Sequence, residues 1–165
     1  MISGQSAFGQ AYDGNDVFVT NDLQMSQNSQ NWWQGAEVRV PSEGNDTCGF
    51  DVALVILGDS VPESVTKPYV PRIDIEPEPD ELYQAVGYGQ TLSGGGGARM
   101  VRSNLAVQCK PGTCSFGIYS TEWLGETGIC QGDSGGPALD LNDKVIGVVS
   151  RGSQGCDTPI YGSVT

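Results

Sequence analysis

The stretch Gly132-Asp133-Ser134-Gly135-Gly136-Pro137 says more about the fold and chemistry of this chain than any other. A serine flanked by glycines exposes its hydroxyl, and a glycine backbone turns sharply enough for two N–H groups to face one developing oxyanion. The shorter pattern Gly-x-Ser-x-Gly also marks the nucleophile elbow of α/β-hydrolases, where a helix follows the serine. Here Pro137 and a strand-like Ala138-Leu139 follow instead, so the elbow interpretation fails. The alternative without chemistry is a glycine-rich turn with an exposed serine.

Short apolar clusters rich in β-branched residues recur along the chain, and they predict strands. Residues 37–40 alternate polar and apolar side chains as a half-buried strand does, whereas the unbroken apolar run 52–57 indicates a strand buried on both faces. Further clusters lie at 17–19, 84–88, 100–107, 116–119 and 145–149. No stretch predicts an amphipathic helix longer than two turns, so the predicted fold class is all-β, a barrel or a sandwich.

The charge of the chain argues against two classes of partner. The 165 residues carry a formal net charge of −12, and such a surface repels phosphate backbones and anionic lipids. We therefore expect no nucleic acid and no membrane as partners. The longest apolar run, 52–57, is far too short to span a bilayer. Residues 1–4 have neither a basic start nor an apolar stretch behind them, so we expect no signal peptide within this chain.

Residues 62–81 differ in composition from the rest of the chain. They hold five prolines with acidic residues between them, and five prolines exclude both a central strand and a helix. We therefore expect an extended surface connection that separates residues 1–61 from residues 82–165.

The chain contains five cysteines and no histidine. A zinc site would need cysteine alone or cysteine with carboxylate. Cys109 and Cys114 offer two thiolates, but no second close pair of cysteines completes a tetrahedron. We therefore expect no metal and no other cofactor. Disulfides are the better interpretation, and they indicate an oxidising compartment.

Taken together, these patterns resemble the trypsin/chymotrypsin-like serine proteases, whose nucleophile lies in the hexapeptide found here at 132–137. Residues 50–57 resemble the segment that supplies the aspartate of the catalytic triad. Residues 86–89, Val-Gly-Tyr-Gly, resemble the Gly-Trp-Gly stretch that opens the second barrel. Residues 148–152 resemble the substrate-binding strand, with Arg151 in place of tryptophan.

The resemblance extends over roughly residues 15 to 165 and implies a chymotrypsin-like double β-barrel. Residues 1–61 would be the remnant of a first, incomplete barrel that carries the triad aspartate. Residues 62–81 would connect the barrels, and residues 82–165 would form the second barrel with the nucleophile and the specificity pocket.

The same resemblance assigns roles by position. Ser134 would be the nucleophile, and the N–H groups of Gly132 and Ser134 would form the oxyanion hole. Asp51 would orient the catalytic histidine, and Asp133 would pair with the N-terminal amine that activation creates. Two disulfides are implied as well, Cys130–Cys156 and Cys109–Cys114. Cys48 is then left over, as expected if its partner lies in a segment outside this chain.

Substrate binding is assigned in the same way, to Gly128, Ile129, Gln131, Ser150, Arg151 and Gly152. Gly128 would floor the primary pocket in place of a carboxylate. An uncharged residue before the scissile bond is therefore expected, rather than lysine or arginine. Gly152 would leave one wall of the pocket open.

One essential group is absent from these 165 residues, because the triad needs a histidine as its base. A chain truncated at both ends would be inactive alone but part of a serine endopeptidase that is secreted, extracellular or periplasmic. That protein would act on protein or peptide substrates and would meet protein inhibitors. A pseudoenzyme that has lost its histidine would instead be a protein-binding module, and a lipase or esterase is a third class. We favour truncation, because Ser134, Asp51 and Asp133 are all in place.

Overall fold

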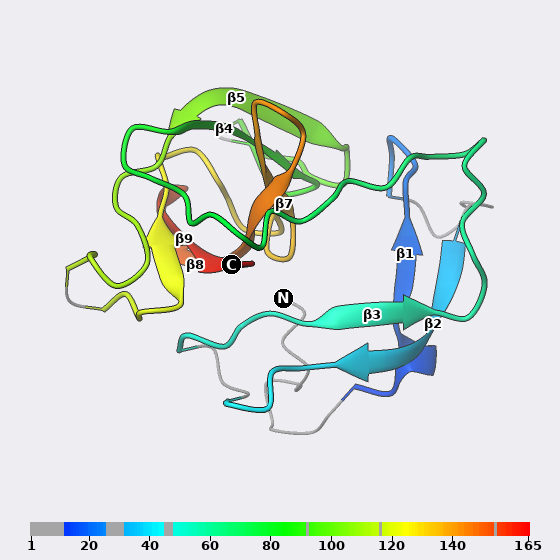
Figure 1. Cartoon of the computed structure of the whole chain (residues 1–165). Coiled ribbons are helices and arrows are strands. Elements are labelled where there is room, and N and C mark those ends of the chain that lie inside the picture. Colours follow the sequence, from blue (N-terminus) through cyan, green and yellow to red (C-terminus); the bar gives the residue numbers. More distant parts are fainter. Residues whose placement is uncertain (1–11, 26–31, 45–47, 92, 116, 154) are drawn as a thin grey trace.

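A computed structural model describes residues 12–25, 32–44, 48–91, 93–115, 117–153 and 155–165. Two antiparallel sheets lie side by side, joined by a long irregular connection (Figure 1). The described residues contain no α-helix, and the predicted all-β class is confirmed. Within that part of the chain, no helix is long and apolar enough to cross a bilayer.

The smaller sheet is built from the first third of the chain. Its strands β1 (Phe18–Thr20), β2 (Trp32–Arg39) and β3 (Leu54–Leu57) pair antiparallel in the order β1-β2-β3. A 3-10 turn, η1 (Gly14–Asp16), precedes β1 and packs on β2. This packing requires glycine at position 14, because a Cβ there would lie 2.3 Å from the Glu37 nitrogen.

The prediction that residues 52–57 are buried on both faces is wrong. Leu54 is 67% exposed and Ile56 is 39% exposed. β3 lies at the edge of its sheet, and among the described residues it pairs with β2 alone. An unbroken apolar run predicts a strand, but the elements that pack on each face decide its burial.

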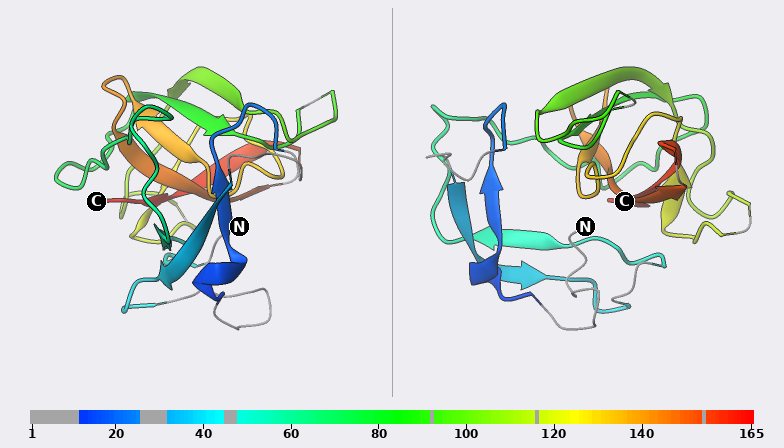
Figure 2. Two further views of the ribbon diagram at one scale, coloured as in Figure 1. Left: turned by 90° about the vertical axis from the view of Figure 1, so that its right-hand side faces the viewer. Right: turned by 180° about the vertical axis from the view of Figure 1, so that it is seen from behind.

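The larger sheet contains six strands, β4 (Leu82–Gly87), β5 (Met100–Ala106), β6 (Glu122–Leu124), β7 (Pro137–Asp140), β8 (Val145–Ser153) and β9 (Asp157–Ser163). They follow the spatial order β5-β4-β7-β8-β9-β6 and curl around a common core (Figures 1 and 2). The clusters at 84–88 and 100–107 overlap β4 and β5 except for their last residue, and the cluster at 145–149 lies within β8. The cluster at 116–119 does not: Phe116 lies outside the described residues, and residues 117–121 form turns and irregular backbone before β6 begins.

Three aromatic side chains form the centre of that core, and each is at most 1% exposed: Tyr83, Trp123 and Tyr161. Trp123 stacks on Tyr161 with ring centroids 4.1 Å apart, and Tyr83 meets both rings edge-on. Burial raises the pKa of Tyr161 far above its ordinary value, so its hydroxyl stays protonated. The Tyr83 hydroxyl donates to the Tyr161 hydroxyl oxygen at 3.3 Å. Burying rings of this size contributes about 2–3 kcal/mol each to stability.

The proline-rich connection contains no strand but is tied to the larger sheet at Arg72. The Arg72 guanidinium donates to both carboxylate oxygens of Glu81 and to Asp140 Oδ2 at 3.1 Å. Its backbone N–H donates to the Val145 carbonyl at 2.9 Å. The side chains of Arg72 and Asp140 are only 11% and 5% exposed, so this ion pair is shielded from water.

Candidate active site

Ser134 lies in the turn between β6 and β7, and this turn is held in place from both sides. The N–H of Gly135 donates to the Val149 carbonyl of β8 at 2.8 Å, and the N–H of Gly136 donates to the Asp133 carbonyl at 2.9 Å. A disulfide joins Cys130, four residues before the serine, to Cys156. The second expected pair, Cys109–Cys114, is also joined, and Cys48 takes part in neither bond.

The backbone N–H groups of the hexapeptide 132–137 differ in their hydrogen-bond partners. Within the described part of the chain, the N–H groups of Gly132 and Ser134 donate to no acceptor, whereas those of Asp133, Gly135 and Gly136 all do. Gly132 has φ +98° and Gly135 has φ +84°, a left-handed backbone that side chains other than glycine rarely adopt. The glycines of the hexapeptide therefore give the turn its shape.

Asp51 reaches the same region from the smaller sheet. Its side chain is 7% exposed, and its Oδ2 accepts a 2.8 Å hydrogen bond from the Ser150 hydroxyl of β8. Its Oδ1 is equally buried, and no described residue donates to it. A buried carboxylate oxygen without a donor is costly, so this atom marks a place where a further N–H group would be stabilising.

A groove of about 630 Å³ adjoins Ser134. Five of the six residues that the sequence assigned to substrate binding line it: Ile129, Gln131, Ser150, Arg151 and Gly152. The groove contains no carboxylate among its described lining residues. The connection between β6 and β7 supplies Ile129, Gln131 and Ser134, and β8 supplies the other three assigned residues of the groove.

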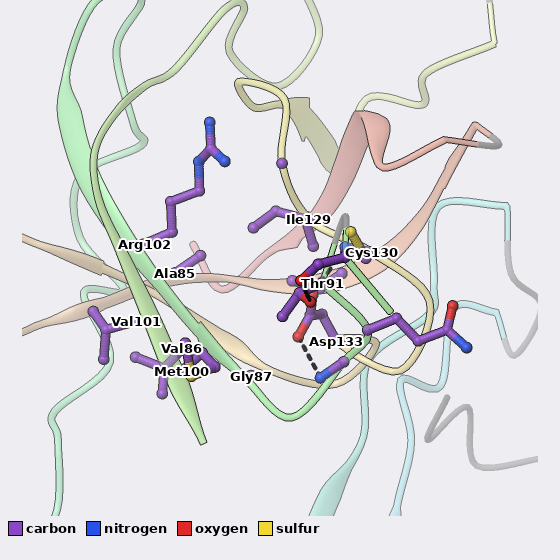
Figure 3. Close-up of a pocket in the computed structure, with 15 residues that line it drawn as sticks. Ala85, Val86, Gly87, Thr91, Met100, Val101, Arg102, Ile129, Cys130 and Asp133 are labelled. Atoms are coloured by element: carbon purple, nitrogen blue, oxygen red, sulfur yellow. Dashed lines mark hydrogen bonds between the residues drawn. The ribbon is translucent and has the colours of Figure 1, made fainter. Parts of the chain in front are cut away.

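Gly128 lies elsewhere, in the wall of a second cavity of about 440 Å³ behind the serine turn. Its Cα packs against the Arg102 guanidinium, since a Cβ on Gly128 would lie 2.2 Å from Arg102 Nη1. Figure 3 shows Arg102 at one end of this cavity and Asp133 at the other, with the apolar side chains of Ala85 and Ile129 between them.

The Asp133 carboxylate is held by two backbone N–H groups. Oδ1 accepts from Gly89 and Oδ2 accepts from Cys130, both at 2.8 Å (Figure 3). Gly87 and Gly89 make room for it, because a Cβ at either position would lie within 2.5 Å of the carboxylate. Asp133 therefore lines the cavity with its position already fixed.

The sequence did not single out Glu122, which is 1% exposed in β6. Both of its carboxylate oxygens accept from Arg151, and the backbone N–H groups of Gly49 and Tyr119 complete its hydrogen bonds at 2.9 and 3.0 Å. Burial works to raise the pKa of Glu122, but the hydrogen bonds from Arg151 and Tyr119 outweigh it and hold that pKa below its ordinary value. The one sequence signal for this carboxylate was Arg151, because an arginine in a largely buried strand needs an acidic partner.

Comparisons with known proteins show which family this sequence matches. The sequence model of the Trypsin family matches residues 9–165. This chain belongs to the trypsin family. A trypsin of Saccharopolyspora erythraea is 32% identical over 120 residues, which cover 67% of this chain and 52% of the relative. Serine protease SP24D of Anopheles gambiae is 34% identical over 118 residues, covering 67% of this chain and 43% of the relative. The chain thus spans about half the length of the curated relatives it matches.

Among solved structures, a mutant of human heparin binding protein (CAP37) has the same fold as this trypsin-family chain. The TM-score is 0.68 at 17% sequence identity, over 87% of this chain and 68% of that protein. At that identity the match supports the fold alone. It agrees with the predicted chymotrypsin-like fold and with the two sheets of this chain.

Proposed function

We propose that Ser134 is the nucleophile of a serine endopeptidase and that Asp51 orients its histidine. Membership of the trypsin family supports a serine protease-like function. The observation that carries the more specific proposal is the Asp51 carboxylate, with one oxygen held by Ser150 and the other buried without a donor among the described residues. A histidine N–H placed there would be fixed in the tautomer that leaves its other nitrogen facing a serine.

The reaction then follows the acyl-enzyme route. The histidine takes the Ser134 proton while the serine oxygen attacks the peptide carbonyl, and the same proton passes to the leaving amine as the C–N bond breaks. Water then hydrolyses the ester, and Ser134 regains its proton. The oxyanion of each tetrahedral intermediate would be bound by the N–H groups of Gly132 and Ser134, which have no acceptor within the described residues.

The histidine must come from a segment outside these 165 residues, which contain none. We propose that the 1–61 part is the incomplete first barrel, that 62–81 is the connection and that 82–165 is the second barrel. Asp133 would pair with an activating N-terminal amine entering the 440 Å³ cavity that it lines. Two disulfides support a secreted protein, with protein or peptide substrates and protein inhibitors as its partners.

The substrate groove supports an uncharged residue before the scissile bond. Ile129 contributes an apolar side chain, Gly152 leaves a wall open, and no described residue of the groove is acidic. We therefore propose that substrates with lysine or arginine at that position are disfavoured, because the family's preference for cations depends on a carboxylate in the pocket.

The deciding experiment extends the chain. The genomic DNA upstream of the Met1 codon is sequenced, and the whole open reading frame is expressed and assayed on peptide amides and on simple esters. We expect a histidine-bearing segment upstream and amidase activity that Ser134→Ala abolishes. The 165-residue chain alone should be slower by on the order of 10⁶ in turnover, the cost of removing the base.

Two other results would overturn the proposal. Stop codons directly upstream, together with peptide binding by the 165-residue chain, would make it a protein-binding pseudoenzyme. Activity on esters without activity on amides would indicate an esterase. Asp51→Asn serves as the matched variant, because it keeps the size of the side chain and removes the charge that favours the correct tautomer.

A further inference from the structure

Glu122 connects the two sheets at the point where Asp51 enters the site. Glu122 lies in β6 of the larger sheet, but its Oε1 accepts a 2.9 Å hydrogen bond from the N–H of Gly49. Gly49 precedes Asp51 by two residues and belongs to the segment that leads into β3. The Gly49 carbonyl is also held, since the Thr121 hydroxyl donates to it. The N–H and the carbonyl of Gly49 are therefore both bound, by Glu122 at the start of β6 and by Thr121 just before it.

Arg151 closes the connection from the other side. It follows Ser150 in β8, and its two terminal nitrogens donate to the two carboxylate oxygens of Glu122. Ser150 in turn donates to Asp51. A closed ring of contacts thus runs from Asp51 through Ser150, Arg151 and Glu122 to Gly49 and back along the chain to Asp51.

The chemistry of Glu122 fits this connecting role better than simple packing. A buried ion pair is often no more stabilising than an apolar pair of similar volume. Only a carboxylate can accept the bidentate arginine and two backbone N–H groups at once, and Glu122 uses its acceptor capacity on these four donors. An apolar residue would fill the same space but would leave the Gly49 N–H unbound.

We propose that Glu122 is a positioning residue, which fixes Asp51 against Ser150 by binding the Gly49 N–H while Arg151 holds its carboxylate in place. The catalytic consequence rests on the proposed function of Asp51. The structural relationship between Glu122 and Gly49 does not rest on that function, and it is tested first.

The test measures amide hydrogen exchange of the full 165-residue chain by NMR, residue by residue. The double variant Glu122→Met with Arg151→Met removes the pair without leaving a buried charge alone. Glu122→Asp keeps the charge but withdraws the carboxylate from Gly49 by one methylene. We expect the Gly49 amide to exchange at least about tenfold faster in both variants, which corresponds to the loss of one charge-assisted hydrogen bond.

Two controls separate positioning from a general loss of structure. The Ser163 amide, which donates to the Thr121 carbonyl beside Glu122, should keep its wild-type exchange rate. The same double methionine substitution at the exposed pair Glu37–Arg39 should leave Gly49 unchanged. Gly49 exchange equal to wild type in Glu122→Asp would overturn the proposal, whether or not the double variant folds.

The catalytic consequence has its own readout in the complete enzyme. Glu122→Asp should lower kcat about tenfold, because it moves the triad aspartate. Any change in KM would report the shift of Arg151, which bonds to Glu122 and lines the substrate groove. If the complete protein has no peptidase activity, the proposed function fails, and the exchange experiment still decides the role of Glu122. If kcat is unchanged while Gly49 is deprotected, Glu122 holds the segment but does not position the triad, and the proposal is overturned.

Discussion

The Ser150 hydroxyl donates a 2.8 Å hydrogen bond to Asp51 Oδ2, joining residues that are 99 positions apart in the sequence. Both side chains are almost fully buried, at 3% and 7% exposure. This bond crosses from β8 of the larger sheet to the segment before β3, and it fixes one carboxylate oxygen while the other is left for a donor outside the described residues. The bond therefore sets the orientation of the group on which the proposed triad depends.

Replacing Ser150 by alanine should destabilise the fold by about 1–3 kcal/mol, because a buried carboxylate would lose its hydrogen-bond donor. Urea denaturation measures the free energy of unfolding. Ser153→Ala is the matched control, since that serine is exposed and bonds to the Thr158 hydroxyl at 3.3 Å. Equal losses in the two variants would contradict the importance of the Ser150–Asp51 bond.

Replacing Arg72 by methionine should cost roughly 3–5 kcal/mol, the range for removing one partner of a buried ion pair. The Asp140 carboxylate would stay buried without its cation, and the proline-rich connection would lose its anchor to Glu81. Thermal and urea unfolding measure the loss. Lys110→Met breaks the more exposed pair with Glu78 and should cost under about 1 kcal/mol. A small effect of Arg72→Met would mean that the connection is held by other contacts.

The stability of the fold should fall in acid because of Glu81 and Glu122. For both carboxyls, burial works to raise the pKa, but hydrogen bonds from Arg72 and Arg151 respectively hold it below the ordinary value of 4.5. A folded-state pKa below the unfolded one gives stability that is complete above about pH 4.5 and is lost as the pH falls through the folded value.

Urea unfolding between about pH 6 and pH 3 measures this dependence. We expect Glu122→Gln to flatten the acid limb of the curve, because the variant has one fewer carboxyl to protonate. The control is Glu37→Gln: the hydrogen bond from Arg39 lowers the pKa of Glu37 as well, but this exposed pair is screened by solvent, so the variant should flatten the curve much less. An unchanged slope in Glu122→Gln would show that this carboxyl does not contribute to acid unfolding.

Replacing Gly89 by alanine should displace the Asp133 carboxylate. The new Cβ would lie 2.5 Å from its Cγ, too close for any real contact, so the hydrogen bonds to Gly89 and Cys130 would be strained or lost. We expect a loss of about 1–3 kcal/mol in the free energy of unfolding. Gly58→Ala is the control, because its nearest neighbour would be the Gln34 carbonyl at 3.6 Å. Similar stability of the two variants would argue that Asp133 moves without cost.

Much of the fold could be predicted because its signals are local. The alternating and β-branched clusters predicted strands that lie in both sheets, and the glycines around Ser134 indicated the sharp turn that holds it. The five prolines of 62–81 predicted the irregular connection. Such patterns reflect backbone preferences of neighbouring residues, and they hold in most environments.

Other features could not be predicted from the sequence, because they depend on which residues the tertiary structure brings into contact. The run 52–57 looked doubly buried, but Leu54 and Ile56 are exposed because β3 lies at a sheet edge. Glu122 carried no motif, although it binds the arginine that replaces the expected tryptophan. Gly128, which the resemblance assigned to the floor of the primary pocket, lies beside Arg102 in a different cavity from the groove at Ser134.

The sequence by itself determined the all-β class, the glycine-rich turn around Ser134 and the family, because each follows from residues that are close together along the chain. Only the tertiary structure decided which partners the buried charges take. A buried carboxylate is stable only beside donors that fix its position. For Asp51 and Glu122 those donors come from strands far away in the sequence, and folding alone brings them together.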